Sequence, residues 1–95
     1  MIKININKDE IIISGHSGYS VEGSDIVCSS VSSICITTVN ALLSIDEDCI
    51  EYVEKDGYLK ITIKKHNEVI DKLIKNMINL LTELQKDYKK YIEIR

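Results

Sequence analysis

The chain has 95 residues, a formal net charge of −3, and no tryptophan, phenylalanine or proline. This length predicts one domain, residues 1–95, and a hydrophobic content of 44% is enough for an aliphatic core rather than a disordered chain. The acidic balance argues against a general nucleic-acid binder, and we expect no apolar run to approach the roughly 20 residues of a membrane span.

Two strands are predicted at the N-terminus. Ile2, Ile4 and Ile6 alternate with polar residues, which is typical of a half-buried strand. A turn-like segment, 7–10, separates them from three consecutive isoleucines at 11–13, so a hairpin is predicted. The N-terminus therefore resembles a strand rather than a signal peptide, and we expect a cytoplasmic protein.

A glycine-rich loop and a helix are predicted next. Residues 15–24 contain three glycines, and a loop of this length in so small a domain is usually functional; Gly18 and Gly23 would give it flexibility. Ser24 or Asp25 can cap the helix that follows. Its apolar stripe has helical spacing and comprises Val27, Val31, Ile34, Cys35, Thr38, Val39 and Leu42.

The second half of the sequence is predicted to form a hairpin, a helix and a short final strand. Strands over 50–54 and 58–64 flank an Asp-Gly turn, and Asn67 can cap a helix. Residues 91–95 can form a last strand. The order β-β-α-β-β-α, with this optional final β, predicts an α+β fold with two helices on a mainly antiparallel sheet. The stripe of the second helix is predicted to be Val69, Ile70, Leu73, Ile74, Met77, Leu81 and Leu84.

The strongest chemical signal is Cys28, twelve positions after His16. A thiol in the first turn of a helix feels unpaired N–H groups and the positive end of the dipole, which favour thiolate. A histidine on a glycine-flanked loop can reach this thiolate as its proton partner. The same residues also fit a buried cysteine and a solvated histidine, so spacing alone leaves both interpretations open.

Two neighbours of Cys28 have alternative roles. Asp25 either caps the helix or orients His16 and binds substrate. Ser32 lies one helical turn after Cys28, so both project from one face, where the hydroxyl either bonds near the sulfur or packs.

The other chemically active residues favour simpler roles. Cys35 and Cys49 are predicted to be core or surface thiols, and His66 to be solvent-exposed. An odd number of cysteines without a C-x-x-C pair predicts neither a disulfide framework nor a zinc site, so we expect no metal and no cofactor.

Two features point weakly to RNA. Residues 15–18 have the G-x-x-G form of a KH loop, and the C-terminal segment 86–95 carries lysines and tyrosines. The loop lacks the basic context of a KH domain, and lysines near a helix C-terminus complement its carbonyl groups. We therefore expect no direct nucleic-acid binding.

One string of residues is much more specific than the Cys-His pair. Gly15-His16, then Gly23-x-Asp25-Ile26-Val27-Cys28-x-x-Val31-Ser32, then Thr38-x-Asn40-Ala41-Leu42 resembles the ribosomal-processing cysteine protease family, called Prp. The first half of the chain carries the resemblance closely, and length and element order fit over all 95 residues. Ser29 and Ser30 stand where the family commonly has two alanines.

The resemblance implies a bacterial, homodimeric, cytoplasmic endopeptidase that removes a short N-terminal extension from a large-subunit ribosomal protein, number twenty-seven, after an aromatic residue. It maps the nucleophile to Cys28 and the histidine to His16, and gives supporting or substrate-binding roles to Gly15, Asp25 and Ser32. The alternative is a non-catalytic, ribosome-associated module that only holds a peptide.

Overall fold

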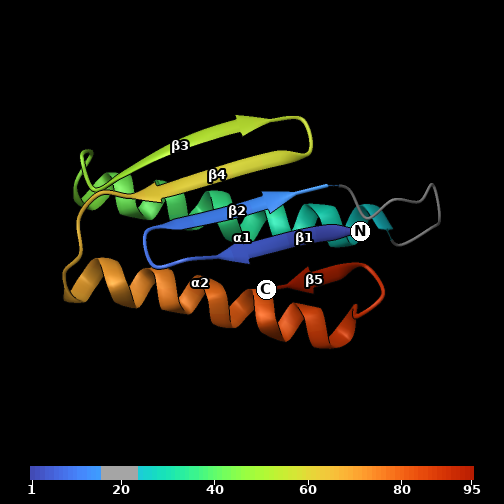
Figure 1. The fold of residues 1–95 in the computed structure, drawn as a ribbon. Coiled ribbons are helices and arrows are strands. Elements are labelled where there is room, and N and C mark those ends of the chain that lie inside the picture. The colour runs from blue at the N-terminus through green and yellow to red at the C-terminus, as the bar shows by residue number, and fades with distance from the viewer. Residues whose placement is uncertain (16–23) are drawn as a thin grey trace.

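The structure is a computed structural model and describes residues 1–15 and 24–95. Within these residues, five strands form one sheet, and two helices pack beside it (Figure 1). The elements in order are β1 (Ile2–Ile6), β2 (Glu10–Ser14), α1 (Ser24–Ile45), β3 (Ile50–Lys55), β4 (Tyr58–Ile63), α2 (Glu68–Asp87) and β5 (Ile92–Ile94). The predicted α+β fold is confirmed, and the optional last strand is present as β5.

The sheet has the order β3-β4-β2-β1-β5. Its four longer strands pair antiparallel, whereas β5 pairs parallel with β1, Ile2 lying opposite Ile92. The β3–β4 hairpin closes where predicted, with Lys55 opposite Tyr58 and a φ of +68° at Gly57, a conformation that glycine adopts without strain.

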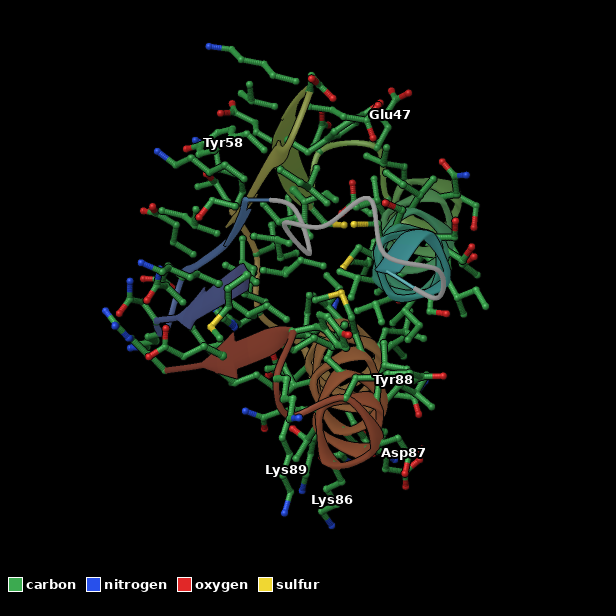
Figure 2. The ribbon with its side chains drawn as sticks, turned by 90° about the vertical axis from the view of Figure 1, so that its right-hand side faces the viewer. Glu47, Tyr58, Lys86, Asp87, Tyr88 and Lys89 are labelled. Carbon is green, nitrogen blue, oxygen red and sulfur yellow. The ribbon has the colours of Figure 1, made fainter. Side chains whose placement is uncertain are left out.

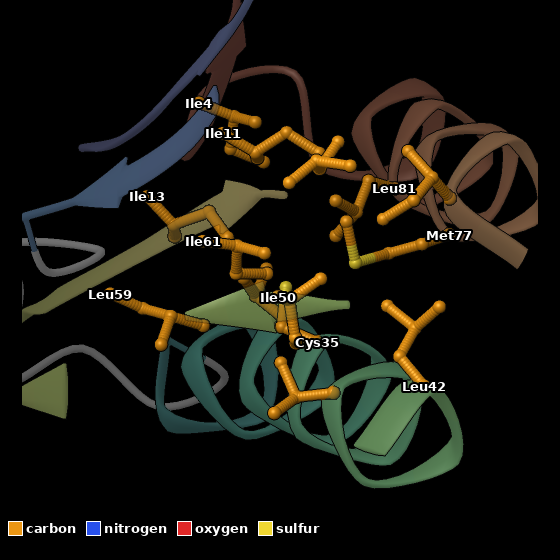
Figure 3. Close-up of a cluster of buried hydrophobic side chains, with 14 of the residues drawn as sticks. Ile4, Ile11, Ile13, Cys35, Leu42, Ile50, Leu59, Ile61, Met77 and Leu81 are labelled. Carbon is orange, nitrogen blue, oxygen red and sulfur yellow. The ribbon is translucent and has the colours of Figure 1, made fainter. Parts of the chain in front are cut away.

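Both helices pack on the same face of the sheet (Figure 2). Between them and the strands lies one aliphatic core, seen in the close-up of Figure 3. Its largest fully buried side chains are mainly isoleucine and leucine: Ile4, Ile11, Leu42, Ile61, Ile70, Met77, Leu81 and Ile92. Core residues alternate along β1, β2 and β4, which is why the other sheet face is polar.

Helix α2 follows its predicted pattern with one exception. The side chain of Asn67 caps the helix by accepting a hydrogen bond from the Ile70 N–H at 2.9 Å. Ile70, Ile74, Met77 and Leu81 are buried. The prediction that Val69 belongs to the buried stripe was wrong, because its side chain is 50% exposed. The four buried residues follow one another at helical spacing and already fill the face of α2 that packs on the sheet.

Helix α1 buries Val27, Val31, Cys35, Val39 and Leu42 along one stripe, as predicted. It continues three residues beyond Leu42, to Ile45. Its poor intrinsic propensity is overcome by this packing, since tertiary burial supplies most helical stability in proteins. Thr38 is nearly buried, and its hydroxyl donates to the Ile34 carbonyl at 2.9 Å.

The expectation that no apolar run approaches membrane-span length was wrong. The segment Ile26–Ile45 of α1 has 20 residues and a mean hydropathy of 1.8, which is long and apolar enough by length and composition to cross a bilayer. Core helices of soluble proteins meet the same criterion, and in this fold one side of α1 is buried against the sheet and α2.

Candidate active site

A groove lies between the first turns of α1 and the hairpin end of β3 and β4. It has a volume of about 600 Å³, within the range of small-molecule sites. Apolar side chains of the sheet and α1 line it together with polar residues of the hairpin end. Its lining residues are Ile2, Ile13, Gly15, Cys28, Val31, Ser32, Cys35, Ile36, Glu54, Lys55, Asp56, Gly57, Tyr58 and Leu59. We call this the Cys28 groove.

Cys28 and Ser32 both line the groove, so the prediction that they share one helix face is confirmed. Cys28 is partly buried and packs against the core.

Cys28 was predicted to lie in the first helical turn, but it lies one residue beyond that turn. Helix α1 begins at Ser24, so Cys28 is its fifth residue. A backbone N–H in an α-helix bonds to the carbonyl four residues earlier, here that of Ser24, and the unpaired N–H groups of a helix start precede that position. The effect of the helix start on the Cys28 thiol is therefore weaker than its predicted first-turn position implied.

Gly15 forms the wall of the groove where β2 ends. Its φ is +93°, and its N–H donates to the Gly57 carbonyl at 2.8 Å, which extends the contact between β2 and the hairpin. A Cβ atom at this position would fall on the backbone carbonyl oxygen of Met1. Only glycine fits at this position without strain.

Several predicted site residues lie outside the described part of the chain. These are His16, Gly18 and Gly23, while Asp25 is described only as a backbone position within α1. Their predicted roles, as acid–base partner, flexible loop positions and supporting carboxylate, stay predictions.

Cys35 and Cys49 are core thiols. Neither has exposed surface, and burial raises the pKa of the Cys35 thiol to about 12. The Cys49 S–H donates to the Leu42 carbonyl at 3.4 Å. Burial, followed by the charge of Asp46, also raises the pKa of Cys49. Both sulfurs therefore stay protonated at neutral pH.

His66 is exposed, as predicted, yet it bridges two elements. Its Nδ1 lies 2.8 Å from an Asp71 carboxylate oxygen in α2, and its Nε2 lies 2.6 Å from one of Asp9 in the β1–β2 turn. The hydrogen bond to Asp71, then that to Asp9, raises the pKa of His66. The cluster lies away from the Cys28 groove. Its two carboxylates contact opposite ring nitrogens of His66, so the three side chains do not surround a common point as metal ligands do. Among the described residues, no group of side chains could hold a metal ion.

The groove residues of the hairpin were missed by sequence reasoning. Glu54, Lys55, Asp56 and Tyr58 were interpreted only as parts of a strand and a turn. Nothing in their local pattern marks them as site residues, because their contact with the groove depends on how the hairpin packs beside α1.

Comparison with known proteins gives one consistent result. The family model for the cysteine protease Prp matches residues 1–93. A ribosomal processing cysteine protease Prp from Mycoplasma genitalium is 33% identical over 64 residues, which are 67% of this chain and 62% of that protein. The matched segment therefore spans less than two thirds of that relative.

Solved structures share the fold. The crystal structure of the S. aureus ribosomal processing protease Prp in complex with a substrate peptide has a TM-score of 0.83 and 21% identity, covering 99% of this chain and 95% of that one. SMU.848 from Streptococcus mutans has a TM-score of 0.77 and 26% identity, covering 99% and 90%. The S. aureus protein has also been crystallised with a covalently linked product peptide, at 22% identity, a TM-score of 0.82 and the same coverage as the substrate complex.

Proposed function

The chain belongs to the cysteine protease Prp family, and on this basis we propose that it is an endopeptidase that removes the short N-terminal extension of a large-subunit ribosomal protein, number twenty-seven, during ribosome maturation. Cys28 is the nucleophile and His16 its proton partner. The observation that carries the proposal is that Cys28 lines a groove of about 600 Å³ together with Gly15, the residue before His16 in the sequence.

The reaction is acyl transfer in two halves. In the first, the Cys28 sulfur attacks the scissile carbonyl carbon, and a C–S bond forms as the C–N bond breaks. His16 gives a proton to the leaving amine, and the new N-terminus departs. In the second, His16 takes a proton from water, whose oxygen attacks the thioester; the C–S bond breaks, and the proton returns to sulfur.

Three residues support this chemistry in the proposal. Ser32 projects into the groove one turn from Cys28, where its hydroxyl can hydrogen-bond to the substrate. Gly15 has a left-handed conformation and lines the groove directly before His16 in the sequence. Asp25, one turn before Cys28 on α1, either orients His16 or binds substrate.

The remaining parts of the proposal concern context. The enzyme acts in the cytoplasm, where ribosomal proteins are made, needs no cofactor, and forms a homodimer. Sedimentation equilibrium at micromolar concentration checks the dimer, and a monomer mass across that range would contradict it.

Cleavage is tested directly with the extended ribosomal protein as substrate. Mass spectrometry of the mixture should show the shortened product with the wild type and none with Cys28→Ala. Cys49→Ala is the matched control, because Cys49 lies between the end of α1 and β3 and does not line the groove. This variant should still cleave the substrate at a temperature where it is folded. An intact substrate with wild type, or unchanged cleavage by Cys28→Ala, would overturn the proposal. Tight binding without any product would favour the peptide-binding module instead.

A further inference from the structure

Strand β3 is an edge of the sheet. Within the described part of the chain it pairs with β4 on one side only, and Figure 1 shows it at the upper border of the sheet. An edge strand presents backbone N–H and C=O groups that can pair with another extended chain. Beyond Ile50 every residue of β3 is exposed, including the large side chains of Tyr52 and Val53.

The register identifies the backbone groups that point outward. The Ile63 N–H donates to the Asp9 carbonyl at 2.8 Å, on the side of β2 and away from β3. The facing pair Ile50–Ile63 is therefore a non-hydrogen-bonded pair. Such pairs alternate along an antiparallel ladder, so the N–H and C=O groups of Tyr52 and Glu54 also point away from β4, toward the open edge.

The side chains of these same residues face the helices. Tyr52 lies opposite Ile61 and Glu54 opposite Leu59, and both partners belong to the core face. Tyr52 nevertheless keeps 46% of its surface exposed, so this part of the sheet face is not covered by α1. Glu54 also lines the Cys28 groove, which makes the open edge of β3 continuous with the groove.

We propose that the peptide substrate binds as an added strand along β3, hydrogen-bonded to the backbone of Tyr52 and Glu54, and enters the Cys28 groove past Glu54. This inference rests on the proposed function. A peptide bond is open to attack when its chain is extended, because folded segments keep their carbonyl groups hydrogen-bonded. In strand addition, hydrogen bonds between the two backbones provide the affinity. Every second side chain of the substrate then lies on the same face as Tyr52, where α1 does not cover the sheet.

The first test changes the substrate backbone. A peptide that spans the cleavage site is made in versions with one N-methylated amide each, and binding to the full-length Cys28→Ser variant is measured by fluorescence anisotropy. Two of these single methylations, at amides two residues apart, should each weaken binding about five- to tenfold, which corresponds to one lost hydrogen bond. Methylation of the amide between them should change the affinity by less than about twofold. Equal effects at all positions, or none, would overturn strand addition.

The second test changes the edge. Glu54→Pro removes one outward N–H, and a proline is tolerated on an edge strand when its N–H would face solvent. Glu54→Val is the matched control, since it removes the same carboxylate but keeps the N–H. Both variants should unfold at similar temperatures, and the proline variant should bind the peptide about fivefold more weakly than the valine variant. Equal affinities would contradict the proposed pairing.

The two proposals fail in different ways. If the unmodified peptide is cleaved but neither test shows the expected difference, strand addition alone is wrong. If the unmodified peptide is neither bound nor cleaved, the peptidase assignment falls, and this inference falls with it.

Discussion

At the scale of single residues, the three cysteines differ in what surrounds their sulfur atoms. Cys28 is only partly buried and lines the groove, whereas Cys35 and Cys49 have no exposed surface and each has a raised pKa. Thiolate is the reactive form of cysteine, so buried protonated thiols are slow nucleophiles. Iodoacetamide at pH 7.5 should therefore alkylate the folded protein once, at Cys28, and all three cysteines after denaturation in urea. Peptide mapping by mass spectrometry checks this, and modification of Cys35 or Cys49 in the folded protein would contradict the described burial.

At the scale of elements, His66 joins the β1–β2 turn to the first turn of α2 through Asp9 and Asp71. The two carboxylates raise its pKa in the folded state. The ion pairs of protonated His66 therefore stabilise the folded state fully below the ordinary histidine pKa of about 6.5. This stabilisation is lost as the pH rises through the raised pKa of His66 in the folded state. We expect the urea midpoints of wild type and His66→Gln to differ most near pH 6 and to converge above neutral pH. A difference that does not vary with pH would show that the bridge adds no charge-dependent stability.

At the scale of the whole molecule, a domain of 95 residues depends on one core. Domains of this size are stable by only about 5–15 kcal/mol, so a single cavity matters. Adjacent residues of α2 provide a sharp test: Ile70 is fully buried, whereas Val69 is half exposed. Ile70→Ala should cost about 2–5 kcal/mol, and Val69→Ala should change stability by less than about 0.5 kcal/mol. Chemical denaturation measures both, and similar costs for the two variants would contradict the observed orientation of α2.

Much of the fold was predictable from local pattern. Alternation along β1, the Asp-Gly turn after β3 and the Asn67 cap of α2 each depend on residues a few positions apart, and each lies where predicted. Val69 shows the limit of this reasoning, because spacing alone does not tell which of two adjacent apolar residues faces the sheet. The start of α1 shows another, since helix ends depend on caps and packing as well as on periodicity.

The candidate site was predictable in part. The shared face of Cys28 and Ser32 followed from helical geometry, in which residues four apart lie above one another. The contribution of Glu54 and Gly57 to the groove could not be predicted, since both lie more than 20 positions from Cys28 along the chain.

The sequence by itself determined the elements, their order and the residues that carry the family resemblance, because these depend on side-chain periodicity and on local turn and cap chemistry. The tertiary structure alone decided the strand order, with β5 parallel to β1 and β3 at an open edge, and the groove that joins α1 to the hairpin. The physical reason is that hydrogen bonds between strands and the packing of helices on a sheet join segments far apart in the chain, and their pairing is settled by burial of the whole core.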